Sequence, residues 1–257
     1  FTSGPISGFG SIIVNGVRFD DSSAQVEDED GGRSSSASLK LGTMVEIESE
    51  RIDDSRGHAK ALRIRFGSEI VGPVTDIDAA ANSFVVLGQT VELKPETVFD
   101  DSLDGTLAGL DGKVVEVHAQ FNAATGHYVA TRIEAEDNPA FYKLRGLVSA
   151  LDRTAQTFKL GEVLISYRNV DAADLPANFA DGQRVRVRLQ TTQQADDSWL
   201  AVTIRTGVRK VEDHDDARLR GTVSALAVDL LHFEINGLPV DASNARIDNG
   251  PLSEGAR

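Results

Sequence analysis

The feature that most constrains this chain is an internal repeat with a period of about 70–75 residues. Each copy opens with the motif Gly-x-apolar-Ser/Thr, in which the apolar residue lies two positions after the glycine. These openings lie at residues 4–7, 72–75, 146–149 and 221–224. The period is too long for a solenoid repeat and suits a small independent β-domain. The sequence therefore predicts four units, at residues 1–69, 70–143, 144–217 and 218–257.

Two further motifs follow each opening in the same order. The first is an apolar run that ends in glycine, at residues 13–16, 86–88, 159–161 and 235–237. The second, which contains Gly-x-x-Val, lies at residues 41–47, 111–117 and 181–187. The fourth unit holds only the lead-in to this last motif, at 252–255, so we expect an incomplete domain. The incomplete fourth unit would be explained by a trimmed sequence, by disorder beyond this point or by cleavage. It would also be explained if a segment of another chain completes the domain.

The residue pattern within one unit is that of β-strands joined by tight turns. Residues 45–50, 114–117 and 184–189 alternate apolar and polar side chains. Asn15-Gly16 and Asn236-Gly237 are dipeptides typical of type I′ hairpins. The second unit predicts strands at about 70–78, 83–88, 89–99, 113–121 and 127–136. The stretches before the fourth strand, at 36–41, 102–110 and 172–180, have room for one or two helical turns.

This order predicts an all-β fold of tandem small five-stranded OB-like β-barrels, with a short helix or loop between strands 3 and 4. A generic five-stranded barrel or an SH3-like roll is the alternative. Aromatic residues recur at equivalent places in the units, which indicates core packing. They are Phe84, Phe99, Phe158, Tyr167 and Phe233.

Composition excludes several classes of protein. The chain has no cysteine and a formal net charge of −14, which argues against thiolate chemistry, Cys-ligated metals and general nucleic-acid binding. No apolar run approaches the roughly 18–20 residues that span a bilayer. No nucleophile elbow, P-loop or His-x-x-x-His pair is present, so we expect no enzyme. The start at Phe1 fits either a removed leader or a trimmed sequence. The lack of cysteine together with the high acidity favours an exported protein, although many cytosolic proteins also lack cysteine.

The motifs Gly-x-Val-x-x-x-Asp, Phe-x-Val-x-Gly and Leu-x-x-Gly-x-x-Val-x-Val resemble those of a bacterial exported repeat family of unknown function. Residues 4–19 look especially like the first repeat of such proteins. The resemblance covers essentially the whole chain. It implies tandem OB-like domains and a place at the cell surface, outside the cell or in the periplasm. It implies no activity and no catalytic residues.

Acidic pairs that follow the third strand are the best candidates for metal binding. Asp20 and Asp21 in the first unit correspond to Asp100 and Asp101 in the second. Their hard oxygen ligands would suit Ca²⁺, the one cofactor that the sequence suggests. No EF-hand or RTX pattern is present. Solvated loop charge or helix capping explains these residues equally well.

A stripe of arginines is the first candidate interface. Arg184, Arg186 and Arg188 alternate along one strand and share a face. This face is either exposed to solvent or in contact with an acidic neighbour. Residues 70–143 hold 12 acidic and 4 basic side chains, and residues 144–217 hold 11 and 10. The second and third units could therefore attract each other head to tail.

The fourth unit is the second candidate interface, through an open strand edge near Gly221, Val223, Phe233 and Ile235. We therefore expect a structural protein that associates with copies of itself, as a head-to-tail surface or extracellular filament. The alternative is a monomeric cell-surface or periplasmic module that binds a glycan or Ca²⁺. Trp199, the single tryptophan, is a weak sign of a surface contact.

Overall fold

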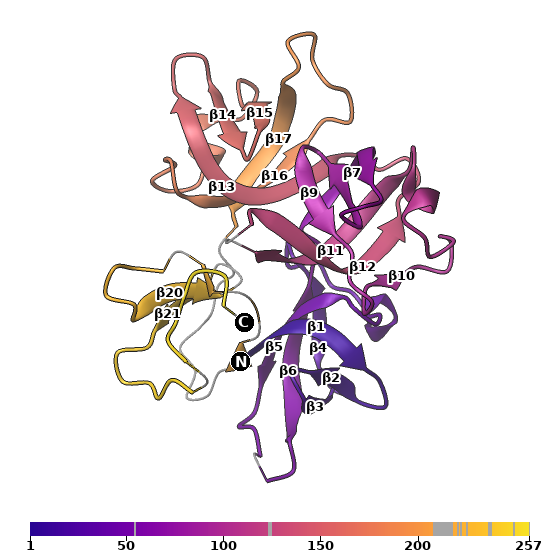
Figure 1. The fold of residues 1–257 in the computed structure, drawn as a ribbon, viewed down its shortest axis with the longest axis vertical. Coiled ribbons are helices and arrows are strands. Elements are labelled where there is room, and N and C mark those ends of the chain that lie inside the picture. The colour runs from indigo at the N-terminus through magenta and orange to yellow at the C-terminus, as the bar shows by residue number, and fades with distance from the viewer. Residues whose placement is uncertain are drawn as a thin grey trace.

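The computed structural model describes residues 1–53, 55–122 and 125–207, and beyond these 218–219, 221, 223–224, 226–235, 238–248 and 250–256. The acidic stretch at 212–216 and the dipeptide Asn236-Gly237 lie outside the described residues. The described chain is all-β, with three short 3-10 helices between strands (Figure 1).

The first barrel contains six strands. They are β1 (Thr2–Gly8), β2 (Ile12–Val14), β3 (Val17–Asp20), β4 (Gln25–Asp28), β5 (Met44–Ser49) and β6 (His58–Phe66). A closed sheet runs in the order β1-β2-β3-β6-β5 and returns to β1. The pairing of β3 with β6 is parallel, and β4 continues the third strand along β6. A 3-10 helix, η1 (Ser36–Ser38), precedes the fourth strand of the barrel, β5. This is the strand order of an OB fold.

The second and third barrels repeat this topology. The second contains β7 (Ile70–Asp78), β8 (Ser83–Val86), β9 (Gln89–Glu92), β10 (Val98–Phe99), η2 (Ala108–Leu110), β11 (Val114–Asn122) and β12 (His127–Ala135). The third contains β13 (Tyr142–Asp152), β14 (Thr157–Leu160), β15 (Val163–Ser166), η3 (Ala172–Asp174), β16 (Arg184–Leu189) and β17 (Trp199–Thr206). The fold class predicted from the sequence is therefore confirmed, including the helical turn before the fourth strand.

Local sequence explains both the agreement and the one difference within the second barrel. The hairpin turn Asn15-Gly16 has positive φ at both residues, 52° and 78°, as a type I′ turn requires. The single strand expected over 89–99 is instead split into β9 and β10. Between them Pro95 lies in a turn closed by a bond from Thr97 N–H to Lys94 O (3.0 Å). Proline interrupts a strand because it has no N–H to donate.

The fourth repeat forms a smaller sheet. Its strands are β18 (Arg218–Leu219), β19 (Val223–Ser224), β20 (His232–Ile235) and β21 (Leu238–Asp241), and β19, β20 and β21 form an antiparallel meander. Val223 exchanges hydrogen bonds with Gly255 (2.9 Å) and Ala256 (2.8 Å). Val148 of the third barrel makes the same pair of bonds, with Gly182 and Gln183. The fourth repeat thus begins its fourth strand in the same register as the complete barrels.

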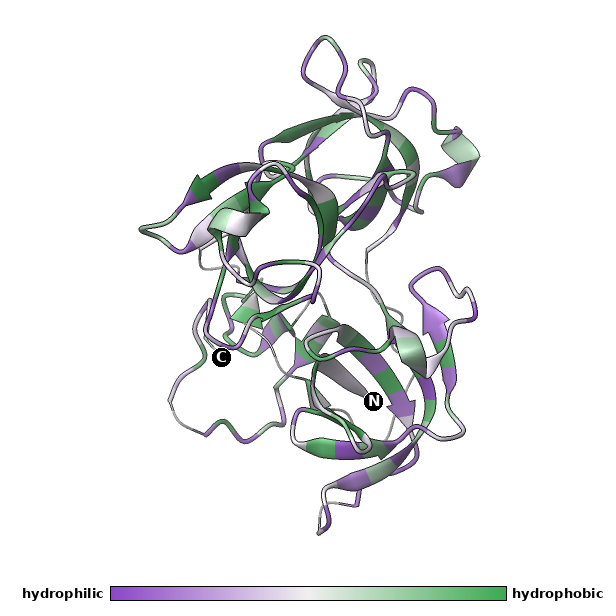
Figure 2. Ribbon diagram, turned by 90° about the vertical axis from the view of Figure 1, so that its right-hand side faces the viewer, coloured by the Kyte–Doolittle hydropathy of each residue, from purple (hydrophilic) through white to green (hydrophobic). Residues whose placement is uncertain are grey.

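Hydrophobic and hydrophilic residues alternate along many of the strands (Figure 2). Most of the apolar strand residues are buried. The cores of the second and third barrels merge into one hydrophobic cluster, whereas the first barrel has a cluster of its own. Phe84, Phe158, Tyr167 and Phe233 are buried and Phe99 is half-buried, as core packing predicts. Among the described residues of the fourth repeat, Val223, Phe233 and Ala242 form a small buried cluster, and Leu238 is buried as well.

Main-chain pairing crosses the barrel boundaries at the first strands. Residues 143–144 of β13 pair with residues 70–71 of β7, which joins the third barrel to the second. Residues 218–219 of β18 pair with residues 2–3 of β1, which joins the fourth repeat to the first barrel. The repeats are therefore packed against one another and are not separate beads (Figure 1). No helix among the described residues is long and apolar enough to cross a bilayer.

Candidate functional site

The first and third barrels meet at a buried cluster of ion pairs around Glu29. Its carboxylate lies 2.9 Å from Lys143 Nζ, 3.1 Å from Arg145 Nη2 and 3.1 Å from Arg186 Nη1. Burial alone would raise the pKa of Glu29, but the charges of Lys143, Arg186 and Arg145 outweigh it and lower the pKa from 4.5 to about 2. Glu29 is therefore ionised at any physiological pH and fixes the first barrel against β13 and β16.

A tight turn after β4 presents these acidic side chains. Asp28 Oδ1 accepts hydrogen bonds from the backbone N–H of Asp30 (2.9 Å) and of Gly32 (2.7 Å), and Gly31 has φ of 81°. Asp30 then pairs with both Arg186 and Arg188. Glu29 and Asp30 thus find their partners over a hundred residues later in the sequence. Glu27, in contrast, pairs with Arg63 and Arg65 of its own barrel.

The arginines of the stripe form ion pairs with acidic residues of the same chain. The side chains of Arg184 and Arg186 are each 8% exposed, so this face of β16 is not open to solvent. Arg184 lies 3.9 Å from Glu234 of the fourth repeat, and the Arg188 guanidinium lies 4.1 Å from the centre of the Phe141 ring. Among the described residues, the acidic groups that meet the stripe thus belong to the first and fourth repeats, not to the strongly acidic second repeat. Its role in contacts between copies stays a prediction.

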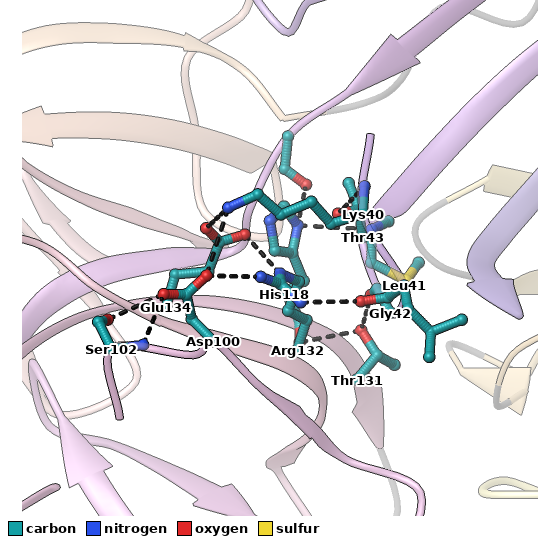
Figure 3. A network of polar contacts seen from close by, with 12 residues as sticks. Lys40, Leu41, Gly42, Thr43, Asp100, Ser102, His118, Thr131, Arg132 and Glu134 are labelled. Atoms are coloured by element: carbon teal, nitrogen blue, oxygen red, sulfur yellow. Dashed lines mark hydrogen bonds and ion pairs between the residues drawn. The ribbon is translucent and has the colours of Figure 1, made fainter. Parts of the chain in front are cut away.

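The first and second barrels meet at a second ionic network, which Figure 3 shows. Lys40 Nζ lies 2.8 Å from Glu134 and 3.3 Å from Asp100. Arg132 donates to Asp100 (2.9 Å) and to the carbonyl oxygen of Leu41 (3.2 Å). Two cations and two carboxylates from separate barrels are therefore mutually paired.

Direct backbone contact accompanies this network. The Thr131 hydroxyl donates to Gly42 O (2.7 Å), and a Cβ atom at Gly42 would lie 2.3 Å from Thr131 O. His118 is buried at the same boundary, with Nδ1 3.1 Å from Gly67 O and 3.4 Å from Met44 N. Burial is the largest cause of the lowered pKa of His118, which keeps the imidazole neutral at neutral pH.

The proposed metal ligands are held in turns instead of a shared site. Asp20 Oδ1 accepts from Ser22 N–H (3.1 Å), and Asp100 Oδ1 accepts from both the N–H (3.1 Å) and the hydroxyl (2.9 Å) of Ser102. Asp21 and Asp101 lie on the surface beside them. Across the described ranges, no group of three or more His, Asp or Glu side chains is arranged to hold a metal ion. The recurring Asp-x-Ser pattern is therefore explained by a local turn.

Three of the four candidates in the fourth repeat lie in its interior, and Gly221 does not. Val223 and Phe233 are buried, and Ile235 packs against them. Gly221 lines a cavity of about 720 Å³ between the first and second barrels, next to Pro5, Leu41 and Gly42. The outward-facing edge of this repeat is instead β21, which among the described residues pairs only with β20.

The fold and these junctions define a class of protein: tandem OB-like barrels that are packed against one another through non-covalent contacts. Residues 71–134, which run from β7 into β12, match a family described as a domain of unknown function, DUF5666. No curated protein gives a significant match. One similar solved structure, from Drosophila, is titled "drosophila Unr CSD456". It is 15% identical, covers 68% of this chain and 79% of that chain, and has a TM-score of 0.22, too low to support a functional argument.

Proposed function

We propose that this chain is a non-enzymatic, exported structural protein that associates with copies of itself through the fourth repeat. The observation that carries the proposal is main-chain pairing between repeats: β7 with β13, and β1 with β18. Repeats of this kind use strand edges to join their neighbours, and another copy can be joined in the same way.

The edge of β21 is the place where such a strand would pair. In the first barrel Arg18 N–H donates to Gly57 O (2.8 Å), which begins the parallel pairing of third and fifth strands. Hairpin register makes Pro239 the counterpart of Arg18, since Leu238 faces Ile235 as Val17 faces Val14. Ala242 N–H donates to Leu231 O, so by alternation residues 239 and 241 present their backbone groups away from β20.

Pro239 limits how strongly this edge can bind. In a complete barrel the third strand offers two backbone N–H donors to the fifth strand. At the corresponding places of β21, residues 239 and 241, Pro239 has no N–H and leaves one donor. Association through β21 is therefore weaker than closure of a barrel and depends on protein concentration. The arginine stripe is already paired within the chain, which leaves the fourth repeat as the favoured surface.

Restoring the missing donor tests this proposal. We expect Pro239→Ala to raise the self-association constant about fivefold, because one added hydrogen bond contributes about 1 kcal/mol. Light scattering after size exclusion, across a wide range of concentration, would show species above the 27.5 kDa monomer, and electron microscopy would show whether they form filaments. Pro95→Ala, at an exposed position in the second barrel, is the matched control. A monodisperse monomer for both the original chain and Pro239→Ala would refute the proposal.

The second candidate function is that of a monomeric binding module. One observation favours it: a cleft lined by Trp199 between the second and third barrels.

A further inference from the structure

The hairpins of the second and third barrels form a fixed cleft where their tips touch. Gln89 Nε2 donates to Leu160 O (3.1 Å), across the two hairpins. A Cβ atom at Gly88 would lie 2.8 Å from Cγ2 of Val163, so the Gly88 backbone packs closely against the Val163 side chain. The cleft beside this contact has a volume of about 510 Å³. Small-molecule sites in proteins measure about 300–1,000 Å³ and favour such boundaries between domains.

Part of the cleft lining is apolar. This part consists of Pro73, Leu87, Val163, Leu164 and Trp199. The Trp199 indole packs edge-on against the ring of Tyr142, with centroids 5.5 Å apart. This contact holds the only tryptophan of the chain in one orientation, partly open to the cleft.

The polar part of the lining, here called the rim, comes largely from the loop that joins β16 to β17, with Lys159 and Glu162 from the β14–β15 hairpin. Gln194 N–H donates to Ser198 O (2.8 Å), and Asp197 N–H donates to Gln194 O (3.1 Å). The Gln193 side chain donates to Asp197 O (2.6 Å). The loop is therefore folded on itself and presents the exposed carboxylate of Asp197 at a fixed place on the rim.

The charge of the rim restricts the ligand. Asp196, Asp197 and Glu162 outnumber Lys159, which itself lies 3.6 Å from Glu162. A phosphate or another anion would be repelled. A neutral sugar fits both the apolar and the polar part of the lining, because its C–H face packs on an indole while its hydroxyls donate to carboxylates.

We propose that this cleft binds a neutral oligosaccharide, with Trp199 as the stacking platform and Asp197 as a hydroxyl acceptor. The site is independent of the fourth repeat, so it goes beyond the structural function proposed above. It deepens the second candidate, the binding module, by naming its ligand class. It would allow an assembled or monomeric copy to attach to a glycan.

The single tryptophan makes the site directly observable. Titration of the intact chain with cellohexaose, laminarihexaose, maltohexaose and chitohexaose should produce a saturable change in tryptophan emission with at least one of them. No change with any of the four would overturn the proposal. A change with pentalysine and none with the sugars would also overturn it, and would indicate a site for basic peptides.

Two variants then locate the binding. Asp197→Asn keeps the positive φ of 61° at this residue, which asparagine tolerates, and should weaken sugar binding about tenfold. Trp199→Phe, followed by calorimetry, should also weaken it about tenfold while the melting temperature stays within a few degrees. Asp101→Asn removes the same charge from an exposed loop of the second barrel and should leave binding unchanged. Unaltered affinity in both cleft variants would place the sugar elsewhere and refute the assignment.

Discussion

The third barrel is joined to the second and to the first in two different ways. Its contact with the second is apolar, with one continuous hydrophobic cluster and strand pairing between β7 and β13. Its contact with the first is ionic and is centred on Glu29. Burial of apolar surface depends little on pH or salt, whereas ion pairs depend on both. The same repeat thus makes one contact that is insensitive to solution conditions and one that responds to them.

A single strand serves both contacts. Along β13, Leu144 is fully buried in the shared cluster, while Lys143 and Arg145 on either side of it contact Glu29. Successive side chains of a strand point to opposite faces, so alternation alone separates the two functions. The predictions that follow alter one contact at a time.

The largest effect should come from the apolar contact. Leu144→Ala removes a fully buried side chain from the shared cluster and should lower the free energy of unfolding by about 3 kcal/mol. Denaturant unfolding, followed by Trp199 fluorescence, would measure this directly. Leu62→Ala, at a side chain that is half exposed, is the control and should change stability by less than about 0.5 kcal/mol.

An intermediate effect should come from the ionic contact. Glu29→Gln leaves Lys143, Arg145 and Arg186 without their shared carboxylate and should destabilise the docked first barrel by about 2 kcal/mol. Hydrogen exchange should accelerate at β4 and leave the shared core unchanged. The control Glu162→Gln removes an exposed carboxylate and should have no such effect. Equal acceleration in all three barrels would show that the contacts are not independent.

The same contact should give a defined pH dependence. The pKa of Glu29 is about 2 in the folded chain and 4.5 in its ordinary range, so its contribution is complete above pH 4.5. It is lost as the pH falls from about 4.5 to about 2, because the unfolded chain then binds the proton first. The stability difference between the original chain and Glu29→Gln should therefore shrink over this window in acid denaturation. A difference that stays constant down to pH 2 would contradict the assignment.

The smallest effect should come from the exposed part of the junction between the first and second barrels. Lys40 is 43% exposed, and its pairs with Glu134 and Asp100 are open to screening by salt. Lys40→Gln should cost less than about 1 kcal/mol at low salt and almost nothing at high salt. Thermal melts at two ionic strengths would show it. The difference would be absent if Arg132 alone holds the two carboxylates.

The fold could be predicted from the sequence because its signals are local. Alternating apolar residues, Asn15-Gly16 and the repeated glycines set strands and turns within each unit. The exception was β9 and β10, where Pro95 divides a run that looked continuous. The sequence also predicted an incomplete fourth barrel, and the described residues form three of its strands and the first hydrogen bonds of a fourth.

The junctions could be predicted only in part. Alternation placed Arg184, Arg186 and Arg188 on one face, but nothing local identifies Asp30 as the partner from 156 positions away. Net charge suggested the second repeat as the acidic partner of these arginines. The charge summed over a repeat does not show which of its loops faces the arginines, so this suggestion missed the loop of the first barrel. The sequence also made Asp100 a candidate metal ligand. Its cationic partners, Lys40 and Arg132, are distant in sequence, so the pattern around Asp100 does not reveal them. A periodic pattern predicts the strands within one unit. It does not predict the contacts between units, because these depend on which surface side chains meet in the folded chain.

The glycine that precedes the fourth strand of each repeat sets a limit on rearrangement. Gly42, Gly112 and Gly182 all have positive φ, between 66° and 82°. At Gly112 and Gly182 nothing lies within 4 Å of an added Cβ, so asparagine would meet the backbone requirement. At Gly42 the neighbouring barrel fills that space, so only glycine fits. The repeats are therefore not interchangeable at this position, and a chain in which the first and third repeats were exchanged would form barrels that fold but do not dock.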